Sequence, residues 1–75
     1  MLKEIKIQGI CSGRPFEKSY LTEAETFKTK KQDGWNMIGF KEQGKTRNTW
    51  VPIGANVNSI VVYEATTGRR LETIL

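Results

Sequence analysis

Alternating apolar and polar residues near the start of the chain predict a β-strand. Over residues 3–10, Ile5 and Ile7 fall on one side of an extended backbone, and Glu4, Lys6 and Gln8 fall on the other. A period of two is typical of a strand with one buried face. The Ser-Gly-Arg-Pro sequence at 12–15 then interrupts the pattern, because glycine and proline favour turns.

Residues 16–26 have no clear period, and two interpretations stay open. Thr22 is followed three residues later by Glu25, which fits a capping box and favours one short helix near 22–31. The apolar face of that helix would consist only of Leu21, Ala24 and Phe27. Because this face is thin, either one or two helical turns or a strand is expected here.

The dipeptide Asp33-Gly34 is the clearest turn signal in the chain. Asp-Gly is favoured in two-residue hairpin loops, because both residues tolerate a positive φ. The turn makes 35–41 the partner strand of the residues that precede it. The resulting register pairs Gln32 with Trp35, Lys30 with Met37, and Phe27 with Phe40.

Further turns and strands follow at short intervals. A turn at 42–45 precedes a threonine-rich strand at 46–51 that ends at Pro52, and a β-prone strand spans 58–64. After a turn at 66–68 the chain returns as a last strand, with Glu64 opposite Arg70 and Tyr63 opposite Leu71. Five or six short strands in one 75-residue domain predict a mainly β fold: a small antiparallel barrel or curved sheet, OB-like or SH3-like.

Positive charge and aromatic residues are concentrated between residues 27 and 50. This stretch holds six of the twelve basic residues and two of the eight acidic ones, so it accounts for the net charge of +4. It also contains both tryptophans and two of the three phenylalanines. Cations interleaved with aromatic rings are typical of surfaces that contact phosphates and stack bases. The candidate nucleic-acid-binding residues are Lys28, Lys30, Lys31, Trp35, Phe40, Lys41, Lys45 and Arg47.

These residues also have a purely structural interpretation. On a strand, Lys28 and Lys30 share one face and Lys31 lies on the other, and lysines on exposed strands prevent edge pairing. Trp35, Phe40 and Trp50 could equally form the core of a small barrel. In the functional interpretation, Trp35 or Phe40 stacks on a base or packs beneath the binding face, and Arg47 stands near Phe40.

Two local resemblances carry no function over to this chain. Residues 39–46 match the Walker A pattern Gly-x-x-x-x-Gly-Lys-Thr, but the β-branched residues and proline that follow do not start the helix that this loop requires. Residues 62–71 are similar to the Tyr-Asp…Thr-Gly…Leu hairpins of propeller blades. That resemblance covers one hairpin and implies only a turn.

The residue types present disfavour catalysis and metal binding. The chain has no histidine and one cysteine, Cys11, so it lacks a Cys–His pair and the ligands of a zinc site. Glu23 and Glu25 are expected in a solvated segment, and Cys11 as a small, partly buried residue. We therefore expect a protein that is not an enzyme and needs no cofactor or metal.

Two hypotheses for function follow from these patterns. The first is a non-enzymatic nucleic-acid-binding protein, with single-stranded DNA or RNA favoured and weak sequence selectivity. The alternative is a protein–protein interaction module, an inhibitor or assembly subunit, that docks on an acidic protein surface. Homo-oligomerisation through an edge strand such as 69–75 fits either hypothesis. With no apolar signal segment or membrane span in the sequence, a cytoplasmic location is expected.

Overall fold

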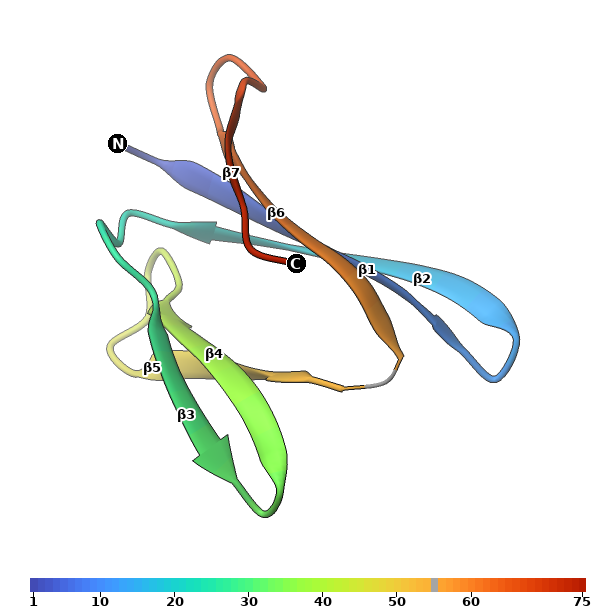
Figure 1. Ribbon diagram of the computed structural model, residues 1–75. Helices are drawn as coiled ribbons and strands as arrows, with labels where there is room; N and C mark the ends of the chain where they lie inside the picture. Colours follow the sequence, from blue (N-terminus) through green and yellow to red (C-terminus); the bar gives the residue numbers. More distant parts are fainter. Residues whose placement is uncertain (55) are drawn as a thin grey trace.

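The computed structural model describes residues 1–54 and 56–75, and the described chain is built from strands alone (Figure 1). These described residues form seven strands where five or six were expected. They are β1 (Lys3–Cys11), β2 (Arg14–Thr22), β3 (Lys28–Gln32), β4 (Trp35–Lys41), β5 (Asn48–Ile53), β6 (Val57–Glu64) and β7 (Arg70–Thr73). The prediction of a short helix near 22–31 is wrong, because this segment contains the end of β2 and the first four residues of β3.

Four strands form the first sheet, in the order β2-β1-β6-β7, and every neighbouring pair is antiparallel. The apolar period at the start of the chain aligns with that of β6, because Ile5 pairs with Val62 and Ile7 with Ile60. The β1–β2 hairpin closes through Ser12 and Gly13, both with positive φ. Residues 16–22 therefore lie in a strand, the second of the two interpretations given above.

The second sheet contains β3, β4 and β5 in that order. Asp33 and Gly34 form its hairpin turn with φ values of 52° and 82°, as the sequence predicts. The predicted register is confirmed for Gln32 with Trp35 and for Lys30 with Met37. Phe27 lies just before β3, and its ring makes an edge contact with that of Phe40 at a centroid distance of 6.2 Å.

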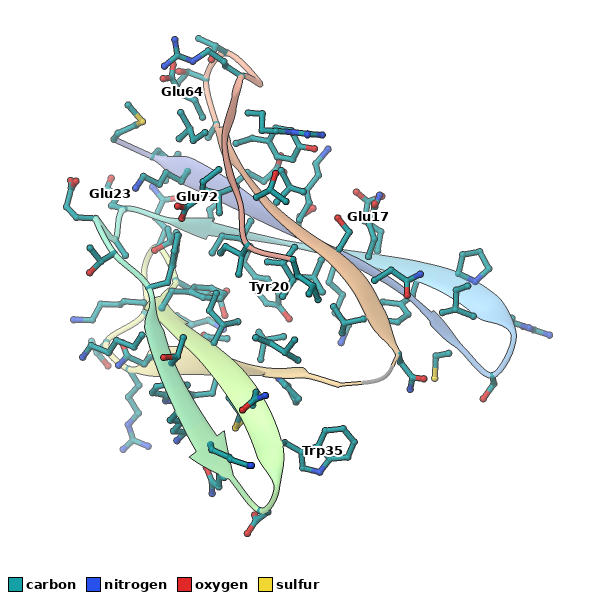
Figure 2. All side chains as sticks on the ribbon, in the orientation of Figure 1. Glu17, Tyr20, Glu23, Trp35, Glu64 and Glu72 are labelled. Carbon is teal, nitrogen blue, oxygen red and sulfur yellow. The ribbon has the colours of Figure 1, made fainter. Side chains whose placement is uncertain are left out.

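One apolar core lies between the two sheets. Ile5, Ile7, Ile60 and Val62 come from the first sheet, and Ile38 and Phe40 come from the second. Tyr20 reaches into the same layer from β2 (Figure 2) and packs edge-on against Phe40 at 5.4 Å. The expected antiparallel all-β architecture is confirmed, but its strands form two separate sheets and the barrel is not closed.

Two strand predictions need correction. The strand expected at 46–51 begins two residues later, at Asn48, and continues through Pro52 to Ile53. Proline is tolerated there because β5 lies at the edge of its sheet. In the last hairpin, Tyr63 pairs with Arg70 instead of Leu71. The predicted register holds where Val62 pairs with Glu72, and a β-bulge between Val62 and Tyr63 then shifts it by one residue. The Glu64 carboxylate accepts hydrogen bonds from Thr66 and Thr67 within the turn.

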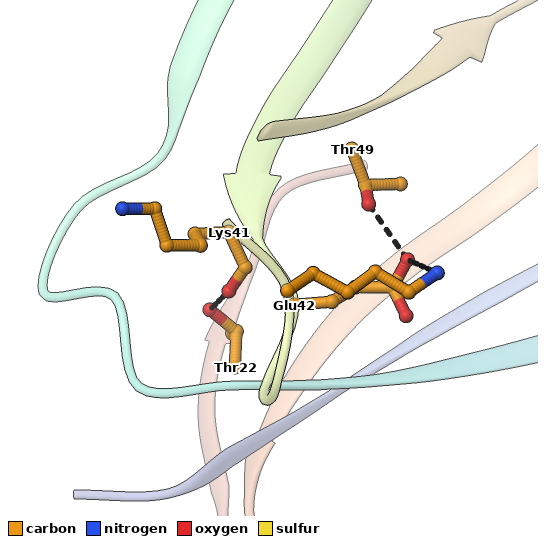
Figure 3. A network of polar contacts seen from close by, with 5 residues as sticks. Thr22, Lys41, Glu42 and Thr49 are labelled. Carbon is orange, nitrogen blue, oxygen red and sulfur yellow. Dashed lines mark hydrogen bonds and ion pairs between the residues drawn. The ribbon is translucent and has the colours of Figure 1, made fainter. Parts of the chain in front are cut away.

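Thr22 connects the two sheets (Figure 3). Its side chain is completely buried, its hydroxyl donates to the Lys41 carbonyl at 2.7 Å, and it accepts from the Ala24 amide at 3.1 Å. Next to it, the Gln43 amide donates to the Leu21 carbonyl at 2.8 Å. The residue that resembled a helix cap therefore holds the end of β2 against the end of β4.

Replacing Thr22 with valine is expected to lower the free energy of unfolding by about 1–3 kcal/mol. Valine has nearly the same shape but removes the hydroxyl that pairs with the partly buried Lys41 carbonyl and Ala24 amide, and polar groups that lose a partner away from water are costly. Urea denaturation monitored by tryptophan fluorescence measures the change. Thr22→Ser, which keeps the hydroxyl, should lose less stability than Thr22→Val, and equal losses would contradict the role of the hydroxyl.

Candidate nucleic-acid interface

The side of the second sheet that faces away from the core is the candidate interface, called the outer face below. Ile38 and Phe40 point into the core, so the alternate residues of β4 point outward. Residues paired across neighbouring strands share a face, so the pairings of β4 with β3 and β5 show which residues of those two strands also point outward. The outward positions used below are Lys28 and Lys30 on β3, Trp35, Met37, Gly39 and Lys41 on β4, and Trp50 and Pro52 on β5.

Both tryptophans lie against a glycine of a neighbouring segment. A Cβ on Gly39 would stand 2.6 Å from the Trp50 ring, and a Cβ on Gly54 would stand 2.7 Å from the Trp35 ring. Each indole therefore covers backbone where the neighbour has no side chain. Trp35 remains 53% exposed and extends from the start of β4 away from the body of the molecule (Figure 2).

A lysine completes the arrangement around Trp50. The Lys30 ammonium lies over the indole, 4.1 Å from the ring centroid, which is a cation–π contact. Because Lys30 belongs to β3 and Trp50 to β5, this contact crosses β4 above Gly39. Between the two indoles, Met37 pairs with Pro52, so apolar side chains continue along the outer face from one ring to the other.

The charge of the outer face is uniformly positive. Lys28, Lys30 and Lys41 occupy it, and no outward position of β3, β4 or β5 is a carboxylate. At the Lys28 and Lys41 end, the face continues into an open groove of about 670 Å³ between residues 23–28 and the loop after β4. Lys45 also lines this groove, together with Glu23 and Glu42.

The loop after β4 is held by Glu42 (Figure 3). Its Oε1 accepts a hydrogen bond of 2.6 Å from the Thr49 hydroxyl and one of 3.4 Å from the Lys45 ammonium. The Thr49 hydrogen bond, more than the charge of Lys45, holds the pKa of the Glu42 carboxyl below its ordinary value of 4.5, although desolvation opposes the shift. This segment of the Walker-like motif is a turn between strands, and no helix follows it.

Because folding lowers the pKa of Glu42, the charged carboxylate stabilises the fold. That contribution is complete above the unfolded-state value near 4.5 and is lost as the pH falls through the lower folded-state value. We expect Glu42→Gln to reduce the fall in melting temperature below pH 4.5 relative to the unsubstituted protein. Thr49→Val, which removes the hydroxyl that donates to the Glu42 carboxylate, should reduce the fall in the same way. Identical profiles for Glu42→Gln and the unsubstituted protein would contradict this account.

The structure brings together half of the predicted site residues. Lys28, Lys30, Trp35 and Lys41 share the outer face. Lys31 lies on the opposite side of β3, as expected, and Lys45 contacts Glu42 at 3.4 Å. Arg47 is exposed in the loop before β5, where Thr49 occupies the place opposite Phe40 that was expected for Arg47.

The sequence left open whether Phe40 and Trp50 lie in the core or on the binding face, and the structure places Phe40 in the core and Trp50 on the outer face. Phe40 is 2% exposed, so it packs beneath the sheet and cannot stack on a ligand. Trp50, absent from the predicted site, lies on the outer face. Trp50 pairs with Gly39, and an aromatic residue opposite a strand glycine commonly covers it. The expected register, with Arg47 opposite Phe40, is two residues out of step and does not reveal this pairing.

Other candidate chemistry is sparse. Cys11 is exposed at the tip of the β1–β2 hairpin, and the expectation of partial burial was wrong because the hairpin extends past the core. Within residues 1–54 and 56–75, no three His, Cys, Asp or Glu side chains are grouped as metal ligands. The same residues contain no helix that is long and apolar enough to cross a membrane.

No protein-family model, curated protein or solved structure gives a significant match to this chain.

Proposed function

We propose that the chain is a non-enzymatic protein that binds single-stranded nucleic acid on the outer face of β3, β4 and β5. The observation that carries the proposal is the pair of indoles lying on a sheet face that has three lysines and no carboxylate. The lysines would neutralise phosphates while the rings stack on bases. Aromatic platforms beside a positive track are the usual means of holding single strands.

A single strand fits this face better than a duplex. The faces of its bases are accessible to an indole, whereas duplex bases are already stacked on their neighbours. Stacking depends on the flat face that every base has, so weak sequence selectivity is expected. The described chain also has no helix that could enter a major groove. An OB-like or SH3-like relationship remains a prediction, and the binding mode proposed here does not depend on it.

Lys30 would change partners on binding. At an exposed site its contact with Trp50 contributes about 0.5–1 kcal/mol, whereas a stacked base contributes about 1–3 kcal/mol. Replacing the Lys30 ammonium with a base on the Trp50 ring therefore lowers the free energy. The displaced ammonium remains on the same face, where a phosphate of the bound strand would be its new partner.

Salt dependence tests the proposal. Fluorescence anisotropy of a labelled oligothymidylate, measured from ~50 to ~300 mM salt, should give a log–log slope near −2, since each phosphate neutralised on a single strand contributes about −0.7. Lys28→Ala and Lys30→Ala should each reduce the slope by about 0.7. Lys28→Ala should lose more affinity than Lys30→Ala, because removing Lys30 also uncovers Trp50.

Lys6→Ala is the matched control for these lysine variants. Lys6 lies over the ring of Tyr63 at 5.4 Å on the first sheet, so this substitution removes the same charge and the same type of contact elsewhere. Its slope should equal that of the unsubstituted protein. An absence of binding at ~50 mM salt would contradict the proposal and favour an acidic protein surface as the partner of the outer face.

A further inference from the structure

The two indoles on the outer face are well separated. Trp50 lies over Gly39, which is four residues along β4 from Trp35. A strand rises ~3.3 Å per residue, so the platforms are about 13 Å apart along β4. They are also displaced sideways by about one strand spacing of ~4.8 Å, because Trp35 covers Gly54 beyond the end of β5.

This separation is too large for neighbouring bases. Stacked bases follow one another at ~3.4 Å, and a fully extended nucleotide spans roughly twice that distance. A nucleic-acid strand that reaches both rings must therefore be extended, with at least one nucleotide between the two stacked bases. That nucleotide would cross Met37 and Pro52, which pair between the rings.

The surface between the two indole rings can accommodate this intervening nucleotide. Met37 is half-buried and Pro52 is exposed, and neither side chain has a hydrogen-bond donor. Nothing in these two side chains would read the edge of the intervening base. Lys30 on β3 pairs with Met37, so a cation lies beside the intervening nucleotide, where it can contact the phosphate of that nucleotide.

We infer that the outer face contains two separate base-stacking subsites, at Trp35 and at Trp50, which one single strand occupies together only with at least one unstacked nucleotide between them. This inference rests on the proposed function and adds a minimum ligand length to it. Once one base is stacked, the second subsite is filled intramolecularly, so affinity should rise steeply at the length that first spans both rings.

Competition with short oligothymidylates tests the inference. Unlabelled strands of two to eight nucleotides would displace a labelled strand of twenty nucleotides from the unsubstituted protein, Trp35→Ala and Trp50→Ala. For the unsubstituted protein we expect a step of about tenfold in affinity between two and four nucleotides, equivalent to one further stacked base. In either single variant the step should disappear, leaving a gradual rise with length.

The outcomes separate this inference from the proposed function. Binding of the labelled strand with the same gradual rise in all three proteins would overturn the two-subsite inference alone. No binding of the labelled strand by the unsubstituted protein would overturn both. As a second measurement, a four-nucleotide strand with one abasic internal position should compete as well as the intact strand. A strand with an abasic position at each end should lose the step.

Discussion

Replacing Trp35 and Trp50 together with alanine is expected to lower the affinity for single-stranded DNA by roughly 30-fold to 10⁴-fold. Each stacked base contributes about 1–3 kcal/mol, so losing two costs about 2–6 kcal/mol. The lysines of the outer face remain, so the salt slope should stay close to that of the unsubstituted protein. Because the variant has no tryptophan, anisotropy of a labelled strand is the appropriate measurement.

The matched control is the double replacement by phenylalanine, which keeps two aromatic faces. It should retain most of the affinity, because a smaller ring still stacks on a base. Thermal unfolding monitored by circular dichroism verifies that both variants are folded. A folded double-alanine variant that binds as tightly as the unsubstituted protein would show that the indoles are not the platforms, whatever the lysines do.

Gly39→Val is expected to weaken both the fold and the binding. A Cβ at this position would stand 2.6–2.7 Å from three carbons of the Trp50 ring, so the indole must leave its place on β4. Overpacking of this kind costs about 1–3 kcal/mol of stability. Loss of the Trp50 platform should cost a further ~1–3 kcal/mol of binding free energy. Urea denaturation and anisotropy measure the two effects separately.

A double-substitution cycle isolates the contact between Gly39 and Trp50. In a Trp50→Ala background the ring is absent, so Gly39→Val should cost little stability or even add some, because valine favours strands more than glycine does. An equal loss of stability in both backgrounds would mean that Gly39 is required for the backbone, and the flat position of Trp50 would lose its explanation.

Local signals in the sequence were sufficient for several elements. The alternation around Ile5 and Ile7 predicts β1, and Asp33-Gly34 predicts both the hairpin and its register, because a two-residue turn fixes the pairing of the strands that it joins. Thr22 shows the limit of such signals. Its spacing to Glu25 fits a helix cap, but the contact that determines its structure is with Lys41, nineteen residues away.

The candidate site could likewise be predicted only in part, because some of its features are local and others depend on tertiary packing. The positive charge of residues 27–50 is visible in the sequence, and the alternation of β3 separates Lys28 and Lys30 from Lys31. Whether Phe40 or Trp50 faces solvent depends on which side of β4 meets the first sheet. That choice is made by tertiary packing against residues such as Ile7 and Tyr20, and no local pattern specifies it.

The most direct test of nucleic-acid binding at the outer face is a titration of ¹⁵N-labelled protein with an eight-nucleotide oligothymidylate, followed by ¹H–¹⁵N correlation spectra. Binding at the outer face predicts shifts of both indole N–H resonances and of the backbone amide resonances in β3, β4 and β5. The amide resonances of β1, β2 and β7 should not shift. Shifts confined to the first sheet, or unchanged indole resonances at saturating ligand, would contradict the assignment of nucleic-acid binding to the outer face.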